Sequence, residues 1–196
     1  MNRPFVLLLL ILAVSCQKPV TRVSLQRTQE NTVPKQDAVK GTFFITQPAK
    51  DECWDVRDQE IGSFNARIQP VKPCHSNQHN MFRISLDSDG WHRISTQYPT
   101  NYSVKENGGP GEPLIASSGS DSIDGPVPSS RWSVEVIGTS GNTITVFIRS
   151  DLVMVDGNRA LCADRPTDAD DKIQIYFCNG GATQQWVLVP TSATPQ

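Results

Sequence analysis

The chain has 196 residues, of which 18 are basic and 20 acidic, and its formal net charge is −2 at pH 7. Because the net charge is nearly neutral and no basic run occurs, the sequence gives no indication of a basic surface that would bind nucleic acid. The part that follows the N-terminal apolar run has the length of one ordinary domain and contains no further segment long enough to cross a membrane.

Residues 1–16 (MNRPFVLLLLILAVSC) read as an export signal, because one Arg precedes an apolar run too short for a mature membrane helix. Two processing routes remain open. Residues 13–15 (AVS) suit ordinary signal cleavage, which gives a soluble secreted protein, whereas residues 12–16 resemble a bacterial lipobox. We expect lipidation of Cys16, since that cysteine is otherwise an exposed free thiol. Gln17 follows it, and by resemblance to enterobacterial sorting this indicates an outer-membrane or cell-surface lipoprotein, held to the membrane by its lipid anchor only.

Residues 17–40 are polar, contain no aromatic residue and show no hydrophobic period. This composition predicts a flexible tether between the signal and the folded domain. Residues 191–196 form a short C-terminal tail.

Between residues 41 and 190 the pattern changes to short segments in which apolar and polar residues alternate. They are TFFITQ (42–47), FRISL (82–86), WHRIST (91–96), WSVEVIG (132–138), NTITVFIRS (142–150), IQIYF (173–177) and WVLVP (186–190). Period-two alternation bounded by Gly, Asp, Asn or Pro predicts β-strands, and no stretch has a helical stripe. The sequence therefore predicts an all-β domain.

Three similar units can be superposed, at about 41–86, 90–138 and 142–190. Each begins with a strand, continues with Cys-x-Asp or a remnant of it, and closes on an aromatic residue: Phe82, Trp132 and Trp186. A single unit is too small to bury a core, but three of them closing on one another form a small barrel with the three aromatics at its axis. The predicted fold is a β-trefoil.

Four cysteines remain besides Cys16, an even number that predicts two disulfides in an exported chain. The first unit holds Cys53 and Cys74 and the third holds Cys162 and Cys178. The second unit lacks both, with Asn101 at the first place and Asp124 near the second. Because the two are lost together, we expect bonds within units, Cys53 to Cys74 and Cys162 to Cys178, each contributing about 3 kcal/mol.

The segments CWDVRD (53–58), LCAD (161–164), IQIYFC (173–178) and ATQQW (182–186) resemble the ricin B-chain-type lectin family, whose units carry Cys-Leu-Asp early and Gln-x-Trp late. The resemblance covers roughly residues 41–190, although the middle unit matches only in outline. It implies a carbohydrate-binding domain that recognises galactose-type or related sugars.

The resemblance places the main sugar site in the third unit. Asp164 would accept hydrogen bonds from two adjacent hydroxyls, and Tyr176 would present its ring to the C–H face of the sugar. Gln184 would orient Asp164 from behind. Thr183 stands where the family usually has an Asn that touches the sugar, so its role would pass through a water or to Asn179.

The other two units match the sugar-binding pattern less well. The first keeps Asp55, but we expect Lys72 at the platform position and His79 and Asn80 in place of the usual Asn and Gln, which makes a weaker second site. In the second unit Ser103 stands where the acid is expected and no aromatic platform follows, so this unit is expected to be structural.

No catalytic arrangement is evident in the sequence. There is no Gly-x-Ser-x-Gly, no His-Glu zinc motif and no phosphate loop, and only Asp164 lies in an argued site, so a glycosidase pair is also missing. His75, His79 and His92 are not at metal-ligand spacing. We therefore expect a non-enzyme without cofactor or metal.

Two functions follow from the sequence. The first is a lectin-like protein, tethered or secreted, whose partners are glycans. The second is an interaction subunit with degenerate sugar sites, because the arrangement of lipobox, polar tether and single trefoil resembles the binding subunits of cytolethal distending toxins. In that case the trefoil would pack against a protein partner.

Overall fold

The computed structural model describes nine stretches of the chain: residues 25–27, 39–48, 50–57, 65–74, 77–100, 102–118, 131–154, 159–167 and 172–191. The expected export signal, including Cys16, and most of the tether and of the C-terminal tail lie outside these ranges. Asn101, Asp124 and His75 do as well, so the predictions made for them stay predictions.

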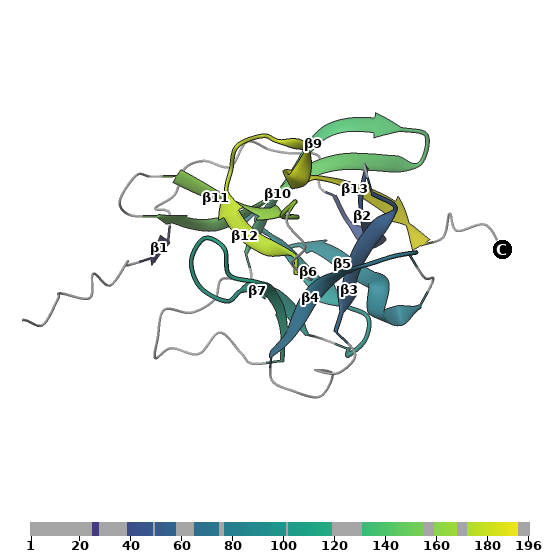
Figure 1. Ribbon diagram of the computed structural model, residues 1–196, viewed down its shortest axis with the longest axis horizontal. Coiled ribbons are helices and arrows are strands. Elements are labelled where there is room, and N and C mark those ends of the chain that lie inside the picture. Colours follow the sequence, from purple (N-terminus) through teal and green to yellow (C-terminus); the bar gives the residue numbers. More distant parts are fainter. Residues whose placement is uncertain are drawn as a thin grey trace, which may run out of the picture.

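Within these ranges the chain forms β-strands and two short 3₁₀ turns, and no α-helix. The strands are β1 Leu25–Arg27, β2 Gly41–Gln47, β3 Glu52–Val56, β4 Asn65–Val71, β5 Met81–Leu86, β6 His92–Thr96, β7 Ser103–Glu106, β8 Leu114–Ser117, β9 Trp132–Ser140, β10 Thr143–Met154, β11 Arg159–Asp164, β12 Gln174–Phe177 and β13 Gln185–Pro190. The turns are η2 Gln78–Asn80 and η3 Ala182–Gln184. The all-β prediction is confirmed (Figure 1).

Six of the strands close into a barrel. β2 pairs with β5, β5 with β6, β6 with β9, β9 with β10, β10 with β13, and β13 returns to β2, each antiparallel. The remaining hairpins, β3–β4, β7–β8 and β11–β12, come one from each unit. They are joined to one another by backbone bonds such as those from Ile173 N to Ile68 O and from Leu114 N to Ile173 O. This arrangement is the predicted β-trefoil.

The closing aromatics Phe82, Trp132 and Trp186 are at most 1% exposed, as predicted. Trp54 packs edge-on against both Phe82 and Trp186, with ring centroids 5.7 and 5.2 Å apart. Edge-to-face packing of this kind stabilises the fold beyond what the burial of apolar surface contributes. The contact of Trp54 with Trp186 therefore holds the first and third units together.

Two indole hydrogen bonds give the correspondence between units. Trp132 Nε1 donates to Val104 O at 3.0 Å, and Trp186 Nε1 donates to Ala163 O at 3.1 Å. Val104 therefore corresponds to Ala163, and the next residue, Lys105, corresponds to Asp164. This corrects the prediction that Ser103 stands at the acid position, because the indole bond fixes a register that differs by two residues from the one inferred from spacing alone.

The structure also differs from the expected tether. Leu25–Arg27 form a short strand that pairs antiparallel with β10 at residues 152–154. Val39, expected in the tether, is 4% exposed and belongs to the hydrophobic core. Parts of the expected tether thus lie against the domain.

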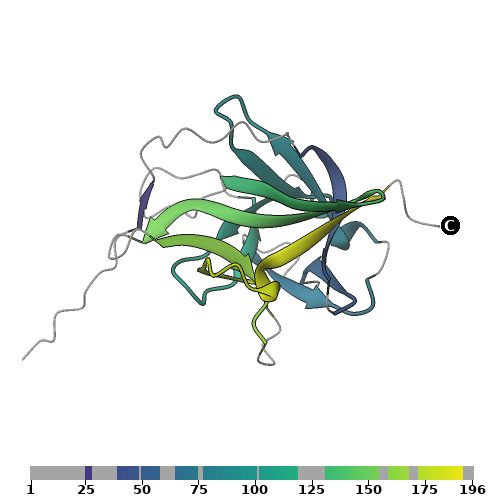
Figure 2. The same cartoon turned by 90° about the horizontal axis from the view of Figure 1, so that it is seen from above.

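The long β9–β10 hairpin runs beside β13 and turns at Gly141, whose φ of +55° suits glycine (Figure 2). Among the residues described, no helix is long and apolar enough to cross a membrane.

Candidate functional site

The hairpin β11–β12 brings the predicted site residues of the third unit onto one face. Asp164 pairs with Gln174 across the two strands, and Cys162 pairs with Tyr176. The intervening residues point into the barrel, since Leu161, Ala163 and Ile175 are fully buried in the core. Because successive side chains alternate between faces, Asp164, Gln174 and Tyr176 share the opposite face.

Gln174 holds the carboxylate of Asp164. Its Nε2 donates to Asp164 Oδ2 at 2.8 Å, and both side chains are largely buried, at 8% and 5% exposure. In the stretches that the structure describes, no donor bonds the second oxygen, Oδ1. One oxygen of a fixed carboxylate therefore remains as an acceptor.

Tyr176 is the exposed aromatic of this face, with 42% of its surface accessible. It lies diagonally across from Asp164 in the ladder, a placement in which residues are typically about 7–8 Å apart and their Cβ atoms somewhat closer. Its ring meets Phe177 edge-on at 5.6 Å, and the guanidinium of Arg159 lies 3.6 Å from the centre of the Phe177 ring. The ring of Tyr176 thus lies near the carboxylate of Asp164, at a strand end where Phe177 and Arg159 pack together.

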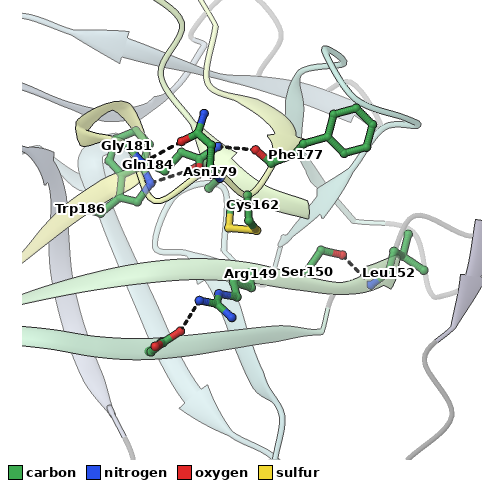
Figure 3. The surroundings of a disulfide bond; sticks show 12 residues. Arg149, Ser150, Leu152, Cys162, Phe177, Asn179, Gly181, Gln184 and Trp186 are labelled. Atoms are coloured by element: carbon green, nitrogen blue, oxygen red, sulfur yellow. Dashed lines mark hydrogen bonds and ion pairs between the residues drawn. A yellow bond between two sulfur atoms is a disulfide. The ribbon is translucent and has the colours of Figure 1, made fainter. Parts of the chain in front are cut away.

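Gln184 does not orient Asp164, which corrects its predicted role. It is fully buried; its Oε1 accepts from Asn179 N at 2.8 Å and its Nε2 donates to Phe177 O at 2.8 Å (Figure 3). The oxygen and the NH2 group of this side-chain amide thus both bond backbone groups at the end of β12 and in the turn that follows it. Gln184 therefore stabilises that turn. Gln174, and not Gln184, orients the carboxylate of Asp164.

Thr183 and Asn179 lie in the segment that follows β12. Thr183 O accepts from Arg165 N at 2.9 Å, so this residue lies beside the end of β11 that carries Asp164. Asn179 Oδ1 accepts from Gly181 N at 2.7 Å within its own turn. The structure thus brings Thr183 next to Asp164, while the Asn179 carbonyl oxygen is engaged locally.

The Cys162–Cys178 disulfide is present as predicted, with a sequence separation of 16. The prediction for the first unit is corrected, because Cys53 and Cys74 are free thiols. The pairing explains the difference between the units. Cys178 comes two residues after Tyr176, the partner of Cys162, whereas Cys74 comes three residues after Val71, the partner of Cys53.

The two free thiols nevertheless contact each other. The hydrogen bond to Cys53 lowers the pKa of Cys74, although partial burial opposes this. The same hydrogen bond, followed by burial, raises the pKa of Cys53. Cys53 therefore acts as the donor and Cys74 as the acceptor of the shared proton.

In the first unit, Asp55 has its carboxylate occupied on both sides. Gln69 Nε2 donates to Oδ2 at 3.0 Å and Asn80 Nδ2 donates to Oδ1 at 2.7 Å. The register also shows that Val71, not Lys72, stands at the position of Tyr176. The predicted second site thus has its acid and Asn80 in contact but presents no aromatic platform on β4.

His79, the remaining residue of that predicted second site, packs toward the second unit. Its ring stacks on Tyr98 with centroids 4.8 Å apart and planes inclined by 8°. Within the described residues, no three His, Cys, Asp or Glu side chains gather as a metal site.

Sequence reasoning missed Gln174. The alternation of IQIYF already sets it on the face of Tyr176, but only the pairing of β11 with β12 shows that it meets Asp164.

No protein-family model and no curated protein sequence matches the chain. Solved structures do resemble it. The designed three-fold symmetric protein ThreeFoil has a TM-score of 0.53 at 17% identity, covering 76% of this chain and 98% of that one. The Rhizoctonia solani agglutinin has a TM-score of 0.54 at 11% identity, covering 78% and 96%. At these identities the similarity concerns the fold, and it agrees with the β-trefoil.

Proposed function

We propose that the protein is a non-catalytic carbohydrate-binding protein whose main site is the outward face of β11 and β12. The observation that carries the proposal is the fixed carboxylate of Asp164, with Oδ1 left as an acceptor, placed diagonally from the exposed ring of Tyr176. A sugar has vicinal hydroxyls beside an apolar face of C–H groups. A carboxylate and an aromatic ring on one rigid surface match those two features.

Of the three units, the third matches the requirements of a sugar site best, because it has both an acid and an aromatic ring at the positions compared. At the acid position the second unit has Lys105, and the first has Asp55 with both oxygens bonded. At the platform position the first unit has Val71. An agglutinin with a similar fold supports the proposal, as does the resemblance of the sequence to ricin B-type units. Galactose-type or related sugars are the ligand class we propose.

One shallow site implies weak binding of a monosaccharide, about −4 to −6 kcal/mol, which corresponds to millimolar to high-micromolar affinity. Many copies on one surface would convert this into useful avidity. A lipid on Cys16 would provide such clustering, and we propose that the protein is exported and anchored in this way. Metabolic labelling with a fatty-acid probe should mark the protein but not its Cys16→Ala variant; absence of label from both would indicate the soluble secreted form.

The test is a glycan array probed with the multivalently presented protein and with its Asp164→Asn and Tyr176→Ala variants. Tyr98→Ala is the matched control, because Tyr98 is also 42% exposed but lies in the second unit. Binding lost in both third-unit variants and kept in the control is the expected result. If the two variants bind as well as the unchanged protein, or if the unchanged protein binds no glycan, the proposal is overturned.

A second candidate function is protein interaction within a toxin-like complex. The poor sugar-binding equipment of two units favours it, as does the apolar pair Val136 and Ile137, which are 39% and 41% exposed on the β9 strand of the long hairpin. A partner that co-purifies with the protein and is lost from a Val136→Ser, Ile137→Ser variant would support this reading.

A further inference from the structure

A second polar surface lies on the outer face of the first unit, on the barrel strands β2 and β5. Thr42 pairs with Arg83 and Gly41 with Ile84, so the register continued by one residue sets Lys40 beside Ser85. Ile84 is 1% exposed and points into the core. The four residues Lys40, Thr42, Arg83 and Ser85 therefore project together from the opposite face, with the two cations on one diagonal and the two hydroxyls on the other.

This surface is hollowed into a groove of about 410 Å³. Its lining comes entirely from the two strands and their ends: Lys40, Gly41, Thr42, Arg83, Ile84, Ser85 and Leu86. A volume in this range suits a small-molecule group together with the ring that carries it.

The groove carries two positive charges, those of Lys40 and Arg83. Neither Lys40 nor Arg83 forms an ion pair with any residue that the structure describes. Asp87, the acid that directly follows β5, is paired with Arg93, whose Nε lies 2.6 Å from Asp87 Oδ2. Because the chain as a whole has a charge of −2, this positive surface is a local feature and not a consequence of a basic protein.

A buried histidine next to the groove adds a second observation. His92 is 3% exposed and pairs across β5–β6 with Leu86, a lining residue. Its Nε2 has no hydrogen-bond partner among the described residues. Burial chiefly lowers its pKa, a backbone bond to Trp132 opposes this, and the charge of Lys40 lowers it further. The charge of Lys40 thus acts on the imidazole of His92, which lies next to the groove.

We propose that the groove between β2 and β5 binds the sulfate or phosphate group of an acidic saccharide. Arg83 would grip two oxygens with its planar guanidinium, Lys40 would supply a point charge, and the hydroxyls of Thr42 and Ser85 would donate to the remaining oxygens. Two cations are too few for a membrane surface, where clusters of four to eight basic residues are typical. The site is independent of Asp164 and Tyr176, because it lies on other strands.

The first experiment is an NMR titration of the purified protein with sodium sulfate and sodium phosphate, against sodium chloride at equal ionic strength. We expect saturable shifts of the backbone amides of residues 41–42 and 83–86 with sulfate or phosphate and not with chloride. Non-saturating shifts, or equal shifts with chloride, would overturn the proposal.

Variants and a saccharide pair complete the test. Arg83→Gln and Lys40→Gln should each weaken sulfate binding about fivefold or more, since each removes a charge-assisted contact. Lys72→Gln, an exposed cation outside the groove, should leave it unchanged. A sulfated disaccharide should bind better than its desulfated form. Binding to vesicles with anionic lipid but not to the sulfated disaccharide would overturn the assignment.

Loss of one proposed site can be distinguished from loss of the other. Asp164→Asn should remove binding of neutral sugars and keep the sulfate-induced shifts, while Arg83→Gln should do the reverse. Thermal unfolding followed by circular dichroism verifies that each variant is folded. A sulfate response lost in Asp164→Asn and kept in Arg83→Gln would contradict the placement of the groove.

Discussion

The side-chain amide of Gln174 and the carboxylate of Asp164 face each other across β11 and β12, joined by a hydrogen bond of 2.8 Å. Gln69 makes the same bond to Asp55 in the first unit, at 3.0 Å. The repeat has therefore kept a cross-strand pair of amide and acid in both units that retain the acid. The two units differ in what surrounds the pair, because Asn80 also donates to Asp55, while none of the residues that the structure describes gives Asp164 a second donor.

Replacing Gln174 by Ala should weaken sugar binding about five- to tenfold, because one hydrogen bond to a charged group would no longer hold Asp164 in place. Isothermal titration or array binding of the multivalent protein measures the change. Gln69→Ala makes the same deletion in the first unit and should leave binding unaffected. Equal losses in the two variants would show that the first unit contributes to the site.

Removing the Cys162–Cys178 disulfide by the double change to Ala should lower the free energy of unfolding by about 3 kcal/mol, because the unfolded chain regains the freedom of a loop of this length. Denaturant unfolding with and without a reducing agent measures it. Under reducing conditions the variant and the parent should converge. A variant as stable as the oxidised parent would contradict a structural role for this bond.

Cys74 should react with iodoacetamide in the folded protein while Cys53 should not. The hydrogen bond from Cys53 lowers the pKa of Cys74, which favours its thiolate, and Cys53 is only 1% exposed. Peptide mass spectrometry after labelling at a series of pH values locates the modified cysteine. Cys53→Ala should slow the labelling of Cys74, because it removes the donor of this hydrogen bond. Equal labelling of both thiols, or no free thiol at all, would contradict the structure here.

Stability should fall as the pH is lowered below about 6.5, the ordinary pKa of histidine, because His92 has a lowered pKa in the folded protein. Between the two pKa values, His92 is protonated in the unfolded chain but neutral in the folded protein. Unfolding therefore takes up a proton and is favoured by acid. The loss stops once the pH is below the folded pKa, where both states are protonated. One such group contributes at most about 1.4 kcal/mol per pH unit.

Urea unfolding at several pH values between 5 and 8 measures this slope. His92→Gln should flatten it, and His79→Gln, which removes a half-buried ring stacked on Tyr98, serves as the control. A slope that survives His92→Gln unchanged would assign the acid sensitivity to other groups.

Several features of the candidate site were readable from local pattern. The alternation of IQIYF sets Gln174 and Tyr176 on one face and Ile175 in the core, and the Gln-x-Trp triplet identifies Trp186 as a core residue. The partners of these residues were harder to foresee. Gln184 was expected beside Asp164 and instead bonds Asn179 N and Phe177 O, since it satisfies the backbone of a turn whose path is set by the disulfide.

The sequence by itself determined the class of fold, the three closing aromatics and the shared face of Gln174 and Tyr176, because the period of side chains along one strand is a local property. The tertiary structure decided which residues meet across strands. The place of Lys105, the free thiols Cys53 and Cys74, and the groove between β2 and β5 all depend on pairing between segments distant in the chain. Such register is fixed only when the barrel closes and buries its core, so it leaves no local trace in the sequence.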